Sequence, residues 1–142
     1  GRVAGINAAG GRALFPEVLS AWISQIGDLQ VGGTGLSRGL ADYYGLDVVE
    51  AKAEGLTRAR YYPGGMRLIV KLIAERESHR LVGGQIVAGE EVTGRVNWLT
   101  AAILKGTTVE EFVTSFENAY CPPTSMVKDV VNDAAEKLLE RL

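Results

Sequence analysis

Residues 66–106 read MRLIVKLIAERESHRLVGGQIVAGEEVTGRVNWLTAAILKG, and this stretch decides the fold. Residues 66–76 and 80–89 are rich in β-branched and apolar side chains, and the polar sequence ESH between them predicts a hairpin of two strands. The period then changes to that of a helix ended by Gly106, because apolar residues recur at intervals of 4, 3 and 4 on one face: Val92, Val96, Leu99 and Ile103. Strands followed by helices predict an α+β fold, with helices packed against an antiparallel sheet.

Upstream of this stretch, the pattern predicts a helix, an interruption and an extended segment. Phe15-Pro16 opens a run with apolar residues at helical spacing, namely Leu19, Trp22, Ile23 and Ile26. The glycine-rich residues 27–37 interrupt this helix, and residues 47–60 read as extended. The sequence YYPGG at residues 61–65 predicts a turn, because proline fixes φ and glycine supplies positive φ.

Three side chains are placed to cap helices. Ser37 can cap a short helix that runs to Tyr43. Thr108 and Glu111 have the spacing of a capping box, which predicts a helix carrying Phe112 and Phe116. Asp129 can cap a last helix with an apolar face, formed by Val131, Ala134, Ala135, Leu138 and Leu139.

Composition restricts the class of protein. The 142 residues are 46% hydrophobic and 23% charged, with a formal net charge of −2, which suits one globular domain with its own core. No basic stripe favours nucleic acid or an anionic membrane surface, and no apolar run approaches the about 20 residues that span a bilayer. With one cysteine and one histidine, neither a disulfide nor a structural zinc site is expected, and a reducing cytoplasm fits best.

The 18 glycines raise the question of a phosphate-binding loop, and three candidates fail. GINAAGG at residues 5–11 lacks the Lys-Ser or Lys-Thr that follows in a P-loop. VGGTGL at residues 31–36 and LVGGQIVAG at residues 81–89 do not match the dinucleotide fingerprint, and the second lies in a predicted strand. We therefore expect Gly83 and Gly84 to let another backbone approach the sheet closely.

The single histidine and the single cysteine each allow a catalytic and a structural interpretation. His79 lies in the predicted hairpin loop, where a solvated side chain is favoured over a general base. Cys121 has no charged neighbour in the sequence closer than Glu117 and Lys128 that could activate its thiol. A small side chain in a tight site before a Pro-Pro turn is therefore favoured over a nucleophile.

Tyr61, Tyr62 and Tyr120 stand beside proline turns. Tyrosines in such places are often packing residues with one end in water, and residue chemistry alone favours that role. Proline turns also hold a side chain in place at little entropic cost. The resemblance described below instead implies that the hydroxyls of Tyr61 and Tyr120 converge at one end of the sheet and are partly exposed.

Several stretches, taken in order, resemble one known family: GRVAGINAAGG, FPEVLSAW, TGLS, RARYYPGG, VKLI, RLVGGQIVAGEEV, GRVNWLTAAILKGTTVEEF, AYCPP and KDVVNDAA. The set resembles the C-terminal dimerisation domain of the flavin-dependent pyridine nucleotide–disulfide oxidoreductases. Within that family it is similar to the branch of NADH oxidases, NADH peroxidases and coenzyme A-disulfide reductases. Each motif alone is weakly specific, whereas the ordered set runs over nearly the whole chain.

The resemblance implies a division of labour within a longer parent protein. Residues 1–14 would be the tail of an absent FAD-binding domain and a linker, and residues 15–142 the dimerisation domain. The parent would be an FAD-dependent NAD(P)H oxidoreductase whose N-terminal domains hold both cofactors and the redox-active cysteine. The isolated chain would bind neither cofactor, form a homodimer and be catalytically inactive. The alternative is an independent, non-catalytic binding or assembly module.

The same resemblance assigns roles to individual residues. Tyr120 matches the tyrosine of the family's AYxPP loop, and Tyr61 matches the first tyrosine of its YYPG turn. Both phenols would face the redox cysteine of the partner subunit, where a neutral phenol can donate a proton to a leaving thiolate or hydroxide. Pro122 and Pro123 would place their loop near the partner's flavin.

The predicted interface and two departures from the family complete the expectations. The apolar surface of residues 92–104 predicts a two-fold interface that uses Val96, Trp98, Leu99 and Ile103. The family's usual acidic residue in this helix is replaced by Asn97, which alters any charge network there. Because no histidine follows His79, the histidine-based mechanism of the glutathione reductase branch is excluded.

Overall fold

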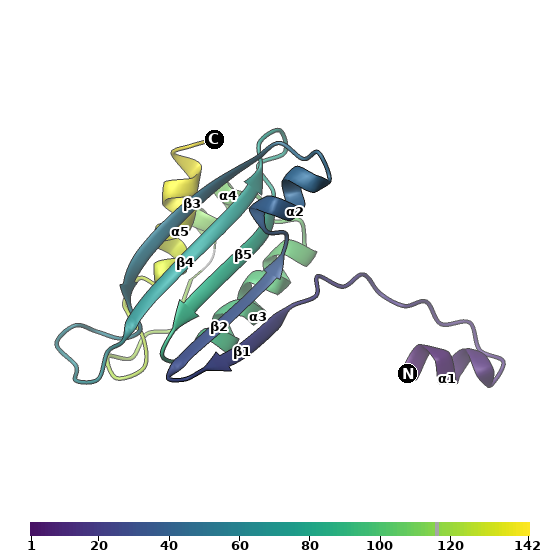
Figure 1. The fold of residues 1–142 in the computed structure, drawn as a ribbon, viewed down its shortest axis with the longest axis horizontal. Helices are drawn as coiled ribbons and strands as arrows, with labels where there is room; N and C mark the ends of the chain where they lie inside the picture. The colour runs from purple at the N-terminus through teal and green to yellow at the C-terminus, as the bar shows by residue number, and fades with distance from the viewer. Residues whose placement is uncertain (116) are drawn as a thin grey trace.

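The computed structural model describes residues 1–115 and 117–142. Five antiparallel strands form one sheet in the order β1-β2-β5-β4-β3, as Figure 1 shows, which confirms the predicted α+β class. The strands are β1 (Trp22–Ile26), β2 (Leu29–Gly35), β3 (Val48–Leu56), β4 (Arg67–Glu75) and β5 (Leu81–Ala88). The helices are α1 (Arg2–Ala8), α2 (Arg38–Tyr43), α3 (Val92–Leu104), α4 (Val109–Ser115) and α5 (Val130–Leu139).

The core lies between one face of the sheet and the helices α3, α4 and α5. Alternate residues of β4 point to this face because side chains alternate along a strand, and Leu68, Val70 and Leu72 are fully buried there. Among the described residues, the opposite face is covered at one end, where Ala41 of α2 packs on Val48 and Ile73. The described part of the chain has no helix long and apolar enough to cross a membrane.

The hairpin of residues 66–89 and the helix after it are confirmed. β4 and β5 pair in antiparallel register from Leu68 opposite Ala88 to Ala74 opposite Leu81. α3 ends just before Gly106, whose φ of +67° is the left-handed conformation that closes a helix.

The helix predicted from Phe15-Pro16 is wrong. Residues 11–21 form neither helix nor strand, and residues Trp22–Ile26 are strand β1, paired with β2. Gly27, with φ of +59°, begins the two-residue turn between the strands, as a hairpin of this kind requires. Most of the glycine-rich segment is itself strand β2. A Cβ at Gly32 would lie 3.0 Å from the Val96 side chain of α3, so glycine at this position allows α3 to pack closely on the strand.

The predicted helix caps are confirmed. The side chain of Ser37 accepts a hydrogen bond from Leu40 N at the start of α2. Thr108 and Glu111 bond reciprocally, at 3.2 Å and 3.0 Å, as a capping box does. Asp129 caps α5 by accepting from Val131 N. Phe116, predicted in the helix after the capping box, lies outside the described residues.

The prediction that another backbone approaches the sheet closely is confirmed at Gly83 and wrong at Gly84. A Cβ at Gly83 would lie 1.9 Å from Leu36 O, so the backbone of the segment after β2 does approach the sheet there. A Cβ at Gly84 would instead meet the Leu99 side chain of α3 at 2.7 Å. Gly84 therefore admits a helix side chain and not a second backbone.

α1 lies apart from the sheet in Figure 1 and buries no residue. The segment that joins it to β1 exposes Leu14, Phe15 and Val18 at 92%, 70% and 62% of their surfaces. A domain boundary between residues 14 and 15 stays a prediction.

Candidate functional site

Two loops meet at one end of the sheet and bring two tyrosines together. The first is the Tyr61 loop, residues 57–66 between β3 and β4, and the second is the Tyr120 loop, residues 117–128 between α4 and α5. The hydroxyls of Tyr61 and Tyr120 lie 2.7 Å apart, within hydrogen-bond distance. Their predicted convergence at one end of the sheet is therefore confirmed.

The Tyr61 loop is a closed turn held at its base and near its tip. Thr57 N donates to Met66 O at 2.9 Å, which continues the β3–β4 pairing, and Tyr62 N donates to Ala59 O at 2.8 Å. Gly64 has a φ of +84°, which the residue after a proline in such a turn requires. The predicted YYPGG turn is thus present, and it presents Tyr61 outward.

The Tyr120 loop is shaped by a turn at its prolines. Thr124 N and Ser125 N both donate to Cys121 O, at 2.9 and 3.0 Å, so the chain folds back immediately after Tyr120. Pro122 and Pro123 are half-buried in this turn, and Pro122 O accepts a hydrogen bond from Ala59 N at 3.3 Å. The prolines therefore join the two loops, while their predicted proximity to a partner's flavin stays a prediction.

The tyrosine pair is open to solvent. Tyr61 is 76% exposed and Tyr120 is 43% exposed, which confirms the prediction that both phenols are at least partly exposed. The hydrogen bond with Tyr61, with a smaller contribution from desolvation, raises the pKa of Tyr120 above the usual value for a phenol. One hydroxyl donates to the other, so the pair retains one O–H for an outside acceptor.

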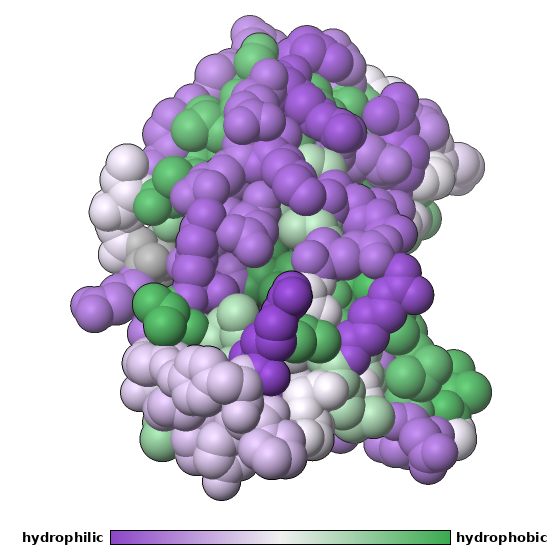
Figure 2. All heavy atoms as spheres, turned by 90° about the vertical axis from the view of Figure 1, so that its left-hand side faces the viewer, coloured by the Kyte–Doolittle hydropathy of each residue, from purple (hydrophilic) through white to green (hydrophobic). Residues whose placement is uncertain are grey.

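The surface around the loops is weakly polar. Figure 2 views the edge of the molecule formed by β3 and α5, and most of this edge is hydrophilic. Paler surface gathers at the lower end, where the two tyrosine loops lie in Figure 1. Tyrosine and proline have this intermediate character, which suits a surface that another protein surface covers.

His79 lies far from this site, at the opposite end of the sheet, in the turn between β4 and β5. Its Nδ1 bonds to Glu110 Oε1 of α4, and this bond holds the pKa of the Glu110 carboxyl below its usual range. The side chain is 38% exposed, so it is a surface residue, but one with a partner that sequence reasoning missed. The described residues contain no cluster of His, Cys, Asp and Glu suited to a metal.

Cys121 is exposed in the Tyr120 loop. The prediction that it fills a tight site is therefore wrong, because the surrounding turn is held by backbone and Ser125 hydroxyl bonds and leaves the thiol in solvent. Ser125 Oγ shapes the turn instead: it accepts from Cys121 N and bonds to the carbonyl oxygens of Ala119 and Cys121.

The side chains proposed for the interface lie on different sides of α3. Val96 and Leu99 are 3% and 0% exposed and pack in the core, so the sheet already covers them. Their predicted contact with a second copy is corrected: the apolar stripe of α3 serves the domain's own core. Trp98 stacks on Phe112 with ring centroids 5.0 Å apart and, like Ile103, is partly buried. An interface role for these two stays a prediction.

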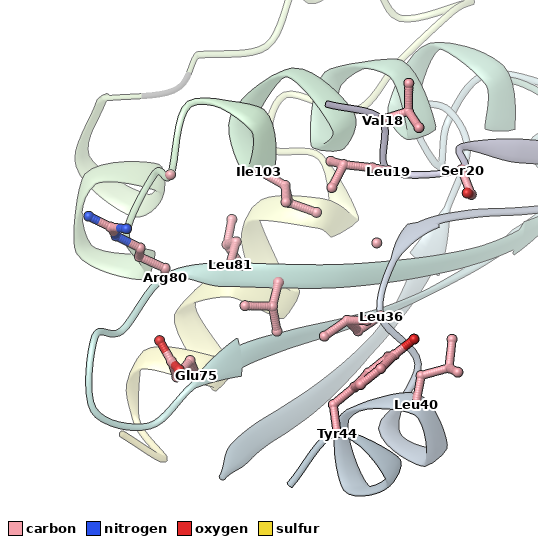
Figure 3. A pocket seen from close by; sticks show the side chains of 13 residues that line it. Val18, Leu19, Ser20, Leu36, Leu40, Tyr44, Glu75, Arg80, Leu81 and Ile103 are labelled. Atoms are coloured by element: carbon pink, nitrogen blue, oxygen red, sulfur yellow. The ribbon is translucent and has the colours of Figure 1, made fainter. Parts of the chain in front are cut away.

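A hollow lies at the end of the sheet away from the tyrosines. Its volume is about 620 Å³, and Figure 3 shows side chains from the segment before β1, from α2, from β5 and from α3 around it. Leu36, Leu81 and Ile103 form apolar walls, and Glu75 and Arg80 lie at one side. Sequence reasoning missed this hollow, because its walls come from segments with no shared motif.

Comparison with known proteins places this architecture in a family. Residues 24–130 match the sequence model described as "Pyridine nucleotide-disulphide oxidoreductase, dimerisation domain". The chain belongs to that family. The sequence resemblance that rested on nine ordered stretches is thereby confirmed.

Similar proteins indicate which branch of the family this dimerisation domain is nearest to. It is 44% identical over 142 residues to a protein named NADH oxidase from Methanocaldococcus jannaschii, covering 100% of this chain and 31% of that protein. It is 38% identical over 130 residues to an NAD(P)H coenzyme A polysulfide/persulfide reductase from Pyrococcus horikoshii, covering 91% of this chain and 28% of that one. The dimerisation domain thus spans less than a third of these relatives.

A solved structure agrees in fold and in sequence. The NAD-dependent persulfide reductase from A. fulgidus superposes on the dimerisation domain with a TM-score of 0.91 and 35% identity, over 99% of this chain and 26% of that one. The relatives are oxidoreductases. The dimerisation domain corresponds to one part of such an enzyme.

Proposed function

We propose that this dimerisation domain belongs to an FAD-dependent NAD(P)H oxidoreductase that cleaves a sulfur–sulfur bond. In the homodimer, Tyr61 and Tyr120 would face the active site of the partner subunit. The observation that carries the proposal is the exposed pair of phenols 2.7 Å apart on loops that lie at one end of the sheet. A packing tyrosine would bury its ring, whereas Tyr61 is 76% exposed.

The choice of a sulfur substrate rests on the relatives. The relative from Pyrococcus horikoshii, 38% identical to this chain, is named for polysulfide and persulfide reduction. A relative from Staphylococcus epidermidis, 30% identical, is named coenzyme A disulfide reductase. The overall change is R–S–S–R′ + NAD(P)H + H⁺ → RSH + R′SH + NAD(P)⁺, with R′ as hydrogen in a persulfide. A proton is consumed, so a donor near the departing sulfur accelerates the reaction.

The residues of this chain would supply that proton donor. When bound, the flavin would carry electrons from NAD(P)H to the sulfur centre. Tyr120, a neutral phenol like any tyrosine with an ordinary or raised pKa, would donate to the departing thiolate, and Tyr61 would orient it through the hydroxyl bond. The turn at Pro122 and Pro123 would keep the phenol at a fixed place and so limit the entropic cost of orientation.

The cofactors would be held by the remainder of the parent. A dinucleotide cradle needs a glycine-rich turn from a strand into a helix. In the described residues, Gly32 and Gly33 lie within β2 and Gly83 and Gly84 within β5, where their missing Cβ atoms make room for packing. We therefore propose that both cofactors bind in the portion of the parent outside residues 15–142. We also propose that the parent is a cytoplasmic enzyme.

A second candidate function is the reduction of oxygen. The 44% identical relative from Methanocaldococcus jannaschii is named NADH oxidase, and that name favours this alternative. In that reaction the phenols would protonate a departing hydroxide or peroxide oxygen and not a thiolate.

One experiment distinguishes the candidates. The purified full-length parent should contain FAD and should consume NAD(P)H anaerobically when coenzyme A persulfide or disulfide is added. Oxygen consumption without a sulfur substrate at an equal or higher rate would favour the oxidase. A parent without flavin would support the alternative of an independent binding or assembly module.

A further inference from the structure

We propose that the turn between β5 and α3, residues 89–91, positions the tyrosine pair, with Glu90 as the positioning residue for Tyr61. The catalytic consequence rests on the function proposed above, whereas the structural part does not. Glu90 Oε1 accepts hydrogen bonds from Thr57 Oγ1 at 2.5 Å and from Arg58 Nε at 3.0 Å. Its second oxygen, Oε2, pairs with Arg58 Nη2. Glu90, which follows Thr57 by 33 positions and Arg58 by 32, thus holds the first two residues of the Tyr61 loop.

The ion pair sits inside the loop and not on its outer surface. Arg58 and Glu90 are 22% and 25% exposed, and a Cβ at Gly65 would lie 3.2 Å from Arg58 Cγ. The aliphatic part of Arg58 therefore fills the space between the two arms of the loop. Such a pair, bidentate and partly shielded from water, holds its geometry better than an exposed one.

The base of the loop is bonded to the same carboxylate. Thr57 is fully buried, and its Oγ1 donates to Glu90 while it accepts from Met66 N at 3.0 Å. Met66 also lies against the turn, because a Cβ at Gly89 would come within 2.1 Å of its side chain. The turn thus contacts both ends of the Tyr61 loop, once through Glu90 and once through Gly89.

The backbone of the Tyr61 loop in turn fixes the positions of the two tyrosines. Ala59, one residue after Arg58, is 4% exposed and donates its N–H to Pro122 O in the Tyr120 loop. Tyr61 itself is 76% exposed, so its ring takes its place from the backbone of the loop and from the hydroxyl of Tyr120. A shift of the loop would therefore lengthen the bond between the two hydroxyls.

The neighbouring residue of the turn reaches the second loop. Glu91 O accepts from Arg95 Nη1 at 2.9 Å, and Arg95 forms a buried ion pair with Asp129, both side chains being 7% exposed. Asp129 N in turn donates to Asn118 Oδ1 at 3.3 Å, at the start of the Tyr120 loop. Both tyrosine loops are therefore tied to adjacent residues of one turn.

The test follows the ionisation of Tyr120 by NMR in the 142-residue chain labelled with [ζ-¹³C]tyrosine, each signal being assigned by a Tyr→Phe variant. The bond from Tyr61 is the first cause of the raised pKa of Tyr120, so Tyr61→Phe should lower that pKa. Glu90→Gln keeps the shape of the side chain and removes its charge. It should lower the Tyr120 pKa in the same direction, and it should add nothing in the Tyr61→Phe background.

Matched variants make the result decisive. Glu54→Gln removes a carboxylate that pairs with Arg67 on the same hairpin but does not contact the loop, and it should leave the Tyr120 pKa unchanged. Arg58→Lys breaks the bidentate pair from the other side and should act as Glu90→Gln does, which covers the case in which one variant does not fold. An unchanged Tyr120 pKa in both loop variants, or an equal shift in Glu54→Gln, would overturn the proposal.

Turnover of the parent separates this inference from the proposed function. Glu90→Gln should lower kcat by up to ~100-fold with little change in KM, and it should cost nothing further once Tyr61 is phenylalanine. If the NMR result holds while Tyr120→Phe turns over at the parent's rate, the positioning stands and the catalytic role of the pair fails. If Glu90→Gln slows turnover equally in the presence and absence of Tyr61, Glu90 does not act through the tyrosine.

Discussion

Replacing Asp129 by alanine should destabilise the domain by far more than the loss of a helix cap. Its Oδ1 accepts from Val131 N at 2.9 Å as the cap of α5, and both oxygens pair with Arg95. Losing a cap costs about 1 kcal/mol, and leaving a buried charge without its partner costs about 3–5 kcal/mol. Because domains have about 5–15 kcal/mol of stability, Asp129→Ala should remove about a quarter of it or more.

Urea unfolding followed by circular dichroism measures the loss, with two variants to divide it. Asp129→Asn keeps a good capping side chain and removes the charge, so it should cost most of what alanine costs. Ser37→Ala removes the cap of α2 alone and should cost about 1 kcal/mol. If Asp129→Ala cost no more than Ser37→Ala, the buried ion pair with Arg95 would contribute nothing, and the reasoning would be refuted.

Three further outcomes are expected. Gly83→Ala should cost about 3 kcal/mol or more in urea unfolding, because the new Cβ would lie 1.9 Å from a backbone oxygen, whereas Gly39→Ala in α2, with nothing within 4 Å, should stabilise by about 0.5–1 kcal/mol. Hydrogen bonds from Lys52 and Arg67 hold the pKa of Glu54 at about 2, below the unfolded value of 4.5, so the stability it adds is full above about pH 4.5 and is lost as pH falls towards 2. As pH falls over that range, the urea midpoint of the unsubstituted chain should therefore fall more steeply than that of Glu54→Gln. Equal slopes of midpoint against pH would contradict the assignment. The isolated chain should be colourless and should not oxidise NADH with added FAD, and a flavin band that survives gel filtration would count against this.

Local signals predicted much of the fold. The β4–β5 hairpin, α3 and the caps at Ser37 and Asp129 depend on residues close together in sequence, so their patterns are readable. β1 was missed because an apolar spacing of three and four residues over residues 19–26 fits a short helix as well as it fits a strand. The Gly27-Asp28 pair, which forms the hairpin turn after β1, was the signal that could have corrected it.

The site was harder to predict because its contacts join distant residues. The two tyrosines are 59 residues apart, and the family resemblance and not any periodicity pointed to Tyr61 and Tyr120 together. Glu90 lies 32 residues from Arg58, and no sequence period marks such a pair, so the positioning turn became visible only in the structure. The interface prediction failed for Leu99 because an apolar helix stripe looks the same whether a sheet or a second copy covers it.

Mixed dimers of the parent test most directly whether the tyrosines serve the partner subunit. One chain would carry Tyr120→Phe, and the other would carry serine at the redox-active cysteine that we place in the remainder of the parent. Each homodimer should be slowed by roughly 10- to 10⁴-fold or be inactive, while Tyr62→Phe and Cys121→Ala homodimers should keep the parent's rate.

In the mixed dimer, an intact cysteine of one chain would meet the intact Tyr120 of the other at one of the two sites. Two affinity tags allow the co-expressed mixed dimer to be purified away from both homodimers. We predict that it recovers about half of the parent's turnover, since one complete site is rebuilt across the interface. A mixed dimer as slow as the two homodimers would contradict the account, because it would mean that each chain depends on its own Tyr120.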